Sequence, residues 1–202
     1  MSRRSIAGLV LASGMSRRYG SSNKLLVQLE GETVIARTVG AYLNSGLDRV
    51  VVVIGYQARK VSSALSALPV DIVLNRRYKE GQSRALVAGI SALASSTDAV
   101  IIGVGDQPLL ESHVISRIAD TYRSTGKRLV AARYLGKRGN PALFDRTLFP
   151  ELLTVEGDVG GRPVLERHRD EIEWIDFTDA RLALDIDSQV DLKDIDPGWT
   201  NL

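Results

Sequence analysis

Residues 13–24 contain glycine, serine and several basic residues. An apolar run, Ile6–Ala12, ends at Ser13 and Gly14, and the basic residues Arg18 and Lys24 follow. Glycine lets the backbone approach a ligand, backbone N–H groups bind its oxygens, and basic side chains neutralise its charge. The segment therefore predicts a phosphate-binding loop; the alternative is a surface turn with solvated cations. It matches neither GxxxxGK[ST] nor GxGxxG, so neither of those nucleotide-binding classes follows.

One aspartate, Asp106, comes just after a second apolar run, Ala99–Val104. Gly105 precedes it and Pro108 restricts the turn that follows, so the carboxylate is held rigidly at the end of a strand. This position suits Mg²⁺, which prefers oxygen ligands and usually takes one or two carboxylates together with substrate phosphates. The alternative is that Asp106 caps the helix that begins near Glu111, or only marks a turn.

Two further aspartates, Asp185 and Asp187, are two residues apart later in the chain. In an extended segment their side chains face the same side, so they could complete a magnesium site with Asp106. The alternative is that Asp187 or Ser188 caps a closing helix, and both interpretations can hold together.

Gly81 and Ser83 come directly before or at the start of an amphipathic segment. Gly81 permits close approach of a ligand, and Ser83 either caps the helix or hydrogen-bonds a nucleobase. His113 and His168 lack the spacing of metal ligands, so we expect surface or packing roles for them.

Short β-branched runs alternate with amphipathic segments up to about residue 132. The expected strands are Ile6–Ala12, Arg49–Ile54, Val70–Leu74, Ala99–Val104 and Leu129–Ala132. The expected helices are Thr33–Ser45, Gln57–Leu68, Ser83–Ala94 and Ser112–Ser124. This alternation predicts a three-layer α/β/α fold with a mainly parallel, Rossmann-like sheet. Ligands bind at the carboxyl ends of such strands, so the loop after Ala12 and the turn at Asp106 should meet.

The 202 residues fit a single domain, here 1–202. Beyond about residue 133 the chain becomes rich in Gly, Pro and Arg, and we interpret residues 133–165 as a substrate-binding insertion in that domain. The net charge of +2 gives no argument for a nucleic-acid partner. No apolar run approaches the roughly 20 residues of a membrane span. The absence of cysteine excludes disulfides and thiolate chemistry and fits a cytoplasmic location.

Several segments together resemble one enzyme family. The MobA-like NTP transferases have the signature LAAGxSxRMGxxK, and residues 11–26 resemble it as LASGMSRRYGSSNKLL, with Ser13 and Tyr19 as departures. GDQPLL is similar to the GDQPxL motif of the branch that makes the molybdenum cytosine dinucleotide cofactor. Weaker similarities link EGQSRA, RGNPALF, GDVGGR and LDIDSQVDL to the family's EGxSxSL, RGHPVLF, GDxGxR and DIDTPEDL. Asn140 replaces the histidine of RGHPVLF, which favours substrate positioning over proton transfer there.

The resemblance implies an enzyme, a nucleotidyltransferase with the nucleotide-diphospho-sugar transferase fold. It implies CTP or another NTP, Mg²⁺ (or Mn²⁺) and a molybdopterin-type phosphorylated acceptor as ligands, with a molybdoenzyme acceptor protein as a further candidate partner. Catalysis is assigned to Lys24, Arg18 and Asp106. Nucleotide binding is assigned to Leu11, Ala12, Ser13, Gly14, Lys24, Gly81, Ser83 and Asp106. Acceptor binding is assigned to Asn140, Pro141, Gly157, Asp158, Gly160 and Arg162, and metal binding to Asp106, Asp185 and Asp187.

Two other functions stay open. One is a different small-molecule nucleotidyltransferase that uses GTP or CTP, because Ser13 leaves the choice of base open. The other is a non-catalytic chaperone that binds molybdopterin, against which the intact Lys24 and Asp106 argue.

Overall fold

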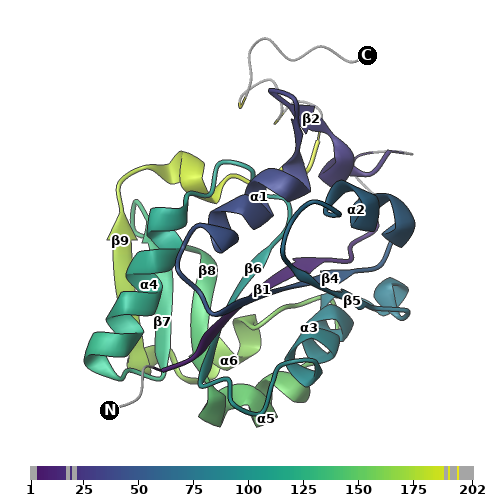
Figure 1. Ribbon diagram of the computed structural model, residues 1–202. Helices are drawn as coiled ribbons and strands as arrows, with labels where there is room; N and C mark the ends of the chain where they lie inside the picture. Colours follow the sequence, from purple (N-terminus) through teal and green to yellow (C-terminus); the bar gives the residue numbers. More distant parts are fainter. Residues whose placement is uncertain (1–3, 17–18, 20–21, 189–190, 192–194, 196–202) are drawn as a thin grey trace.

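A seven-stranded sheet lies between two layers of helices (Figure 1). The computed structural model describes residues 4–16, 19, 22–188, 191 and 195. The strands of this sheet are β1 (Ile6–Ala12), β4 (Arg49–Ile54), β5 (Asp71–Leu74), β6 (Ala99–Val104), β7 (Leu129–Tyr134), β8 (Lys137–Asp145) and β9 (Ile172–Phe177). A separate short hairpin consists of β2 (Gln28–Leu29) and β3 (Glu32–Thr33). The helices are α1 (Val34–Leu43), α2 (Ala58–Ala64), α3 (Gln82–Ser91), α4 (Ser112–Thr125), α5 (Phe149–Leu153) and α6 (Arg162–Arg167).

The sheet has the order β5-β4-β1-β6-β8-β7-β9 and is mostly parallel. β1 pairs in parallel with β4 and β6, β4 with β5, and β7 with β9. Only β8 runs antiparallel to its neighbours β6 and β7. The predicted α/β class with a mainly parallel sheet is confirmed.

The central strand β1 is apolar throughout because both of its faces are covered. All seven of its residues are buried. Val10 belongs to the core under α1 and α4, whereas Leu9 and Leu11 belong to the core that contains α3, α5 and α6 residues. Figure 1 shows these two helix layers on opposite sides of the sheet. A strand buried on both faces reads as a continuous apolar run, which is why the sequence predicts it.

The four predicted helices are present as α1 to α4, with ends that differ by a few residues. Gly126 caps α4 in the left-handed conformation, which glycine adopts without a steric penalty and which is typical of helix C-termini. The cap of α1 is Asn44, and Gly46 follows two residues later with a φ of +74°. None of the helices in the described part of the chain is long and apolar enough to cross a membrane.

Two strands of the seven-stranded sheet, β8 and β9, are not predicted from the sequence, and neither is the short hairpin of β2 and β3. β8 lies within the region 133–165 and takes a place inside the sheet, next to β6. Its pairing with β7 shifts register between Ala131 and Arg133: Ala131 pairs with Ala142, but Arg133 pairs with Arg138. The region is therefore partly built into the central sheet, and its role in substrate binding stays a prediction.

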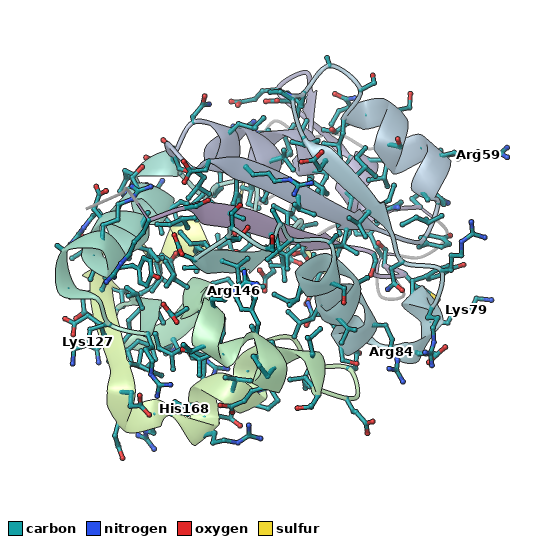
Figure 2. All side chains as sticks on the ribbon, turned by 60° about the horizontal axis from the view of Figure 1, so that its bottom comes forward. Arg59, Lys79, Arg84, Lys127, Arg146 and His168 are labelled. Carbon is teal, nitrogen blue, oxygen red and sulfur yellow. The ribbon has the colours of Figure 1, made fainter. Side chains whose placement is uncertain are left out.

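Charged side chains of both signs lie exposed on the described part of the surface. Figure 2 shows Arg59, Lys79 and Arg84 projecting from one end of the molecule and Lys127 from the other. His113 lies on the surface, where its ring packs edge-on against Phe177 with a centroid distance of 5.9 Å. The predicted packing role of this histidine is confirmed.

Candidate active site

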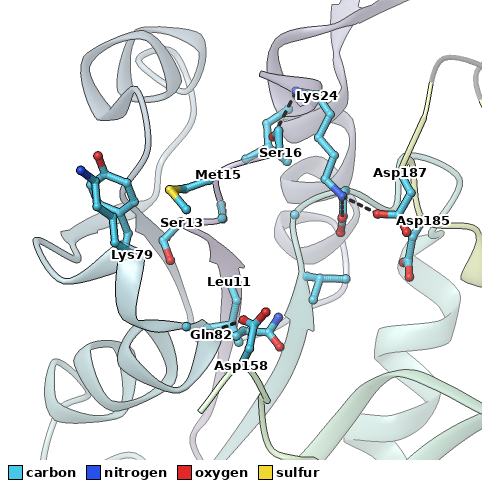
Figure 3. Close-up of a pocket in the computed structure, with 18 of the residues that line it drawn as sticks. Leu11, Ser13, Met15, Ser16, Lys24, Lys79, Gln82, Asp158, Asp185 and Asp187 are labelled. Atoms are coloured by element: carbon cyan, nitrogen blue, oxygen red, sulfur yellow. Dashed lines mark hydrogen bonds and ion pairs between the residues drawn. The ribbon is translucent and has the colours of Figure 1, made fainter. Parts of the chain in front are cut away.

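The carboxyl ends of β1 and β6 open into a pocket of about 850 Å³ (Figure 3). Leu11 of β1 pairs with Val104 of β6, so the loop after β1 and the turn at Asp106 meet there, as predicted. The predicted site residues that line this pocket are Leu11, Ala12, Ser13, Gly14, Lys24, Gly81, Asp106, Asn140, Asp158, Asp185 and Asp187. The structure brings these residues together; their individual roles stay predictions.

The loop after β1 is closed by hydrogen bonds between its two ends. The side-chain oxygen of buried Asn23 accepts from the Leu25 amide (3.1 Å) and from the Ser16 hydroxyl (3.4 Å). Its amide nitrogen donates to the Tyr56 carbonyl (3.4 Å), and the Lys24 amide donates to Ser16 Oγ (3.4 Å). These bonds hold Lys24 at the pocket. The predicted catalytic Arg18 lies outside the described residues.

The ammonium group of Lys24 lies between two aspartates. Its Nζ is 2.5 Å from Asp106 Oδ2 and 3.0 Å from Asp187 Oδ1. Burial alone would lower the pKa of Lys24, but the two carboxylates outweigh this, and its pKa is raised. Lys24 therefore carries a stable positive charge where the strands end.

In the described part of the chain, three carboxyl groups line the pocket near the single charge of Lys24: Asp106, Asp185 and Asp187. Asp106 Oδ1 is buried and accepts no hydrogen bond from any described residue. Desolvation by the surrounding protein raises the pKa of Asp185 to about 6, and the negative charge of Asp106 contributes to this shift. The Asp185 side chain nevertheless lines the pocket. Asp106 thus has a free carboxylate oxygen, and the neighbouring Asp185 has a raised pKa. A bound cation would supply the missing partner for both groups, so the pair fits a cation site.

The segment with Asp185 is attached to the turn that holds Asp106. The Ile186 amide donates to the Asp106 carbonyl (3.0 Å), and the Gln107 side chain donates to the Ala183 carbonyl (3.1 Å). In the described chain, no three Asp, Glu, His or Cys side chains form a metal site by themselves. The residues present therefore fit an ion held by one or two carboxylates with substrate phosphates as further ligands.

The first turn of α3 is covered by the loop at residues 157–158. The Gln82 amide donates to Asp158 Oδ1 (3.0 Å), and the Ser83 amide donates to the Gly157 carbonyl (3.2 Å). Gly81 has a φ of +104°, and a Cβ there would lie 2.6 Å from the Gly157 oxygen, so this contact requires glycine. Ser83 is buried and does not line the pocket, in contrast to Gly81.

Asn140 reaches the pocket from the irregular part of β8. Its carbonyl accepts a hydrogen bond from Tyr134 Oη (2.7 Å). Arg162, by contrast, forms an exposed ion pair with Glu166 (2.6 Å). The predicted acceptor-binding residues outside the pocket lining are Pro141, Gly157, Gly160 and Arg162. Asn140 and Asp158 are therefore the predicted acceptor residues that the structure brings to the pocket.

Several residues that line the pocket have no site role assigned from the sequence. They are Met15, Ser16, Leu25, Tyr78, Lys79, Glu80, Gln82, Val104 and Gly105. The sequence does indicate a local cluster of basic residues, Arg76, Arg77 and Lys79, just before Gly81, and the structure brings Lys79 of this cluster to the pocket. Tyr78 has no comparable signal, because a lone tyrosine is typical of many surfaces.

Residues 8–172 match the MobA-like NTP transferase domain. The chain belongs to this family. The bifunctional protein GlmU of Synechococcus sp. (strain RCC307) is 29% identical over 168 residues, which are 81% of this chain and 36% of that protein. The purine catabolism protein PucB of Bacillus subtilis (strain 168) is 28% identical over 170 residues, 80% of each chain. The crystal structure of Rv0371c from Mycobacterium tuberculosis H37Rv has a TM-score of 0.85 and 25% identity, covering 96% of this chain and 98% of that one.

Family membership confirms the predicted MobA-like domain and its nucleotidyltransferase class. The cytidylyltransferase branch is not confirmed, because the relatives are GlmU and PucB proteins. The chain spans only about a third of the GlmU protein, 36% of its length, so likeness to GlmU concerns one part of that protein.

Proposed function

We propose that the protein transfers the nucleotidyl group of an NTP to a phosphorylated small molecule and releases pyrophosphate. The observation that carries this proposal is the Lys24 ammonium, 2.5 Å from Asp106 in a pocket at the carboxyl ends of β1 and β6. Membership of the MobA-like NTP transferase domain family supports it.

The reaction needs no nucleophile from the protein. An acceptor phosphate oxygen attacks the α-phosphorus of the NTP in line, a new P–O bond forms, and the bond to the leaving pyrophosphate breaks. The chain supplies positioning and charge neutralisation. Backbone amides at Ser13 and Gly14, with Lys24, would bind the triphosphate, and we propose the same role for Arg18.

Asp106, with one or both of Asp185 and Asp187, would hold the Mg²⁺ or Mn²⁺ ion. When bound, the ion supplies positive charge to the phosphate oxygens. Lys24 now pairs with Asp106 and Asp187, so its ammonium would exchange these partners for the triphosphate when substrate enters. The unpartnered Asp106 Oδ1 supports this assignment.

For the substrates we propose CTP and a molybdopterin-type acceptor, because GDQPLL, RGNPALF and GDVGGR resemble the cytidylyl branch. Asn140 and Asp158 would contact the acceptor, and a molybdoenzyme would receive the product. An NTP substrate also fits a cytoplasmic location. Ser13 favours a second candidate, another nucleotidyltransferase that uses GTP or CTP, because a hydroxyl replaces the usual Ala or Gly.

The test is a screen of the four NTPs with Mg²⁺ and molybdopterin, in which NTP affinity and pyrophosphate release are both measured. We expect release with CTP at the highest rate. Binding of an NTP without release would contradict molybdopterin as the acceptor and leave either a nucleotidyltransferase with another acceptor or a non-catalytic chaperone. Absence of binding by all four NTPs would contradict the nucleotidyltransferase proposal itself. Glu151→Gln, on α5 and outside the pocket lining, is the matched control and should keep the parent rate.

A further inference from the structure

A buried asparagine, Asn75, contacts Ser13 from behind the pocket wall. Its Nδ2 lies 3.3 Å from Ser13 Oγ, and each residue is only 4% exposed. The backbone N–H of Asn75 donates to the Ile54 carbonyl (2.8 Å), and this bond fixes Asn75 just beyond the ends of β4 and β5. Ser13 lines the pocket and Asn75 does not. The direct side-chain contact of Asn75 with a residue of the pocket lining is therefore the one with Ser13 that the structure describes.

Ser13 also packs against Gly55, where no further atom fits. A Cβ at residue 55 would lie 2.8 Å from Ser13 Cβ and 2.6 Å from Tyr78 Cβ. The Tyr56 amide also donates to the Ser13 carbonyl (3.3 Å). Ser13 is thus held by backbone, by packing and by Asn75, so its hydroxyl has a defined position.

The direction of the Asn75–Ser13 hydrogen bond follows from a third group. The Arg77 backbone N–H, which can only donate, points at Asn75 Oδ1 (3.0 Å), so the amide nitrogen of Asn75 faces Ser13. That nitrogen also can only donate, and Ser13 Oγ therefore accepts. Within the described part of the chain the hydroxyl makes no other hydrogen bond, so its hydrogen remains available to a ligand. This corner of the pocket presents a donor.

We propose that Asn75 is a positioning residue that keeps the Ser13 hydroxyl as a hydrogen-bond donor, so that the pocket prefers a nucleobase with a carbonyl oxygen, such as cytosine, over adenine. The inference rests on the proposed NTP substrate. Cytosine, uracil and guanine each carry a carbonyl oxygen, whereas adenine carries none and accepts hydrogen bonds only at its ring nitrogens. A buried donor placed to meet an exocyclic carbonyl oxygen is left without an acceptor by adenine, which penalises that base.

Asn75→Asp tests the direction of this bond. The carboxylate still accepts from the Arg77 N–H, but it would also accept from the Ser13 hydroxyl and turn that donor away from the pocket. We expect the ratio of CTP to ATP affinity, from calorimetry with Mg²⁺, to fall about tenfold, as expected for the loss of one discriminating hydrogen bond. CTP and ATP share the triphosphate, so the effect of the added charge cancels in the ratio.

Ser13→Ala should lower the same ratio by a similar factor, and Asn75→Asp should then have no further effect in the Ser13→Ala background. Asn44→Asp adds the same charge at an exposed position and should leave the ratio unchanged. A parent protein that binds CTP and ATP equally overturns the inference, as does a ratio that stays unchanged in Asn75→Asp or in Ser13→Ala. If Asn75→Asp fails to fold, an unchanged ratio in Ser13→Ala still overturns it. If the parent binds none of the NTPs, the proposed function falls, and this inference falls with it.

Discussion

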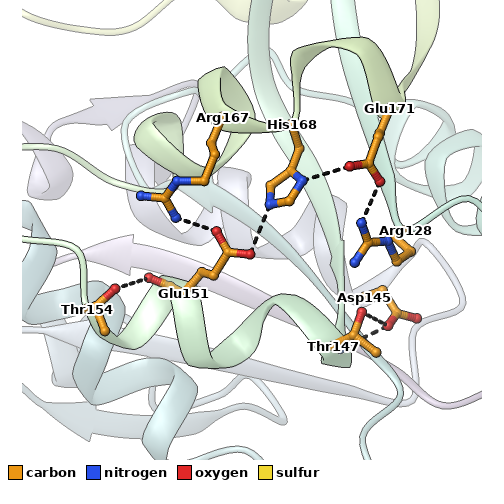
Figure 4. Close-up of polar contacts among 8 residues, drawn as sticks. All are labelled: Arg128, Asp145, Thr147, Glu151, Thr154, Arg167, His168 and Glu171. Carbon is orange, nitrogen blue, oxygen red and sulfur yellow. Dashed lines mark hydrogen bonds and ion pairs between the residues drawn. The ribbon is translucent and has the colours of Figure 1, made fainter.

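Two clusters of charged side chains lie at opposite ends of the strands and balance their charges differently. At the pocket, at the carboxyl ends of β1 and β6, Lys24 pairs with two carboxylates, and Asp106 Oδ1 has no donor among the described residues. The other cluster includes Arg128 and Glu171, which immediately precede β7 and β9. There Glu151 pairs with His168 (2.9 Å) and Arg167, and Glu171 pairs with His168 (2.8 Å) and Arg128 (2.5 Å) (Figure 4).

The difference separates groups that stabilise the fold from groups that await a ligand. In the cluster of Glu151, Glu171, His168, Arg128 and Arg167, here called the His168 cluster, each carboxylate pairs with an arginine and with His168. Such pairs near the surface contribute modestly to stability. Among the described residues around Lys24, the negative charge exceeds the positive charge in a partly enclosed site, where a ligand with its cation would restore the balance. Changes in the two clusters should therefore affect different measurements.

The largest effect is expected for Asp106→Ala. Its loss removes the carboxylate with the unpartnered oxygen, and pyrophosphate release should fall on the order of a thousandfold, while NTP binding without metal persists. Initial rates of pyrophosphate release with saturating NTP measure this. Release at the parent rate would show that Asp106 holds no catalytic metal.

Lys24→Ala should weaken NTP binding by about tenfold or more, because a charged hydrogen bond to phosphate is lost. Lys24→Arg should rescue it poorly, since a planar guanidinium does not replace a compact ammonium between two carboxylates. Titration calorimetry gives the affinities, and Lys60→Ala, exposed on α2, is the control. Equal affinity of Lys24→Ala and the parent would make Lys24 a structural residue only.

Gly81→Ala should lower both thermal stability and nucleotide affinity. Ala at a φ of +104° is strained, and its Cβ would also collide with the Gly157 oxygen. Gly136→Ala is the matched control, because Gly136 has a φ of +78° with nothing within 4 Å of the added Cβ. The control should lose about 1 kcal/mol from left-handed strain alone. Similar stability losses in both variants would mean that the loop at 157–158 moves away without penalty.

The smallest effect is expected for His168→Gln. Hydrogen bonds to Glu171 and then to Glu151 raise the pKa of His168, so its contribution to stability is complete below about pH 6.5 and is lost as pH rises through the raised pKa. The pKa values of both glutamates are lowered, so they stay ionised at pH 5.5. The difference in Tm between parent and variant should be about 2 °C or less at pH 5.5 and smaller at pH 9. A difference in Tm that grows as the pH rises would contradict the stabilising role of protonated His168. The rate of pyrophosphate release should not change in this variant.

The strands that the sequence predicts are those whose side chains obey one simple pattern. β1 and β6 read as continuous apolar runs because helices cover both faces. β8 contains Gly139 and Pro141, which are typical of turns, and they fall where the register with β7 shifts and the ladder is already interrupted. The same irregularity carries Asn140, so the feature that hides the strand from sequence reasoning also brings a side chain to the pocket.

The site is predictable where strand ends converge and not where loops meet by tertiary packing. Lys24 and Asp106 follow strands that pair in parallel, so their proximity is expected from the fold class. Ser83 belongs to the same sequence motif as Gly81, yet the packing of α3 buries Ser83 away from the pocket. The contact between Asn75 and Ser13 joins residues 62 positions apart and has no local signature in the sequence.

The central claim is that the pocket binds an NTP through Lys24, and a thermal-shift titration tests it most directly. With Mg²⁺ and NTP at about 100 times Kd, binding stabilises the folded state by roughly 2.7 kcal/mol. The account predicts a rise in Tm for the parent protein and an equal rise for Glu151→Gln, but a much smaller rise for Lys24→Ala. An equal rise in Lys24→Ala, or no rise in the parent with any of the four NTPs, would contradict it.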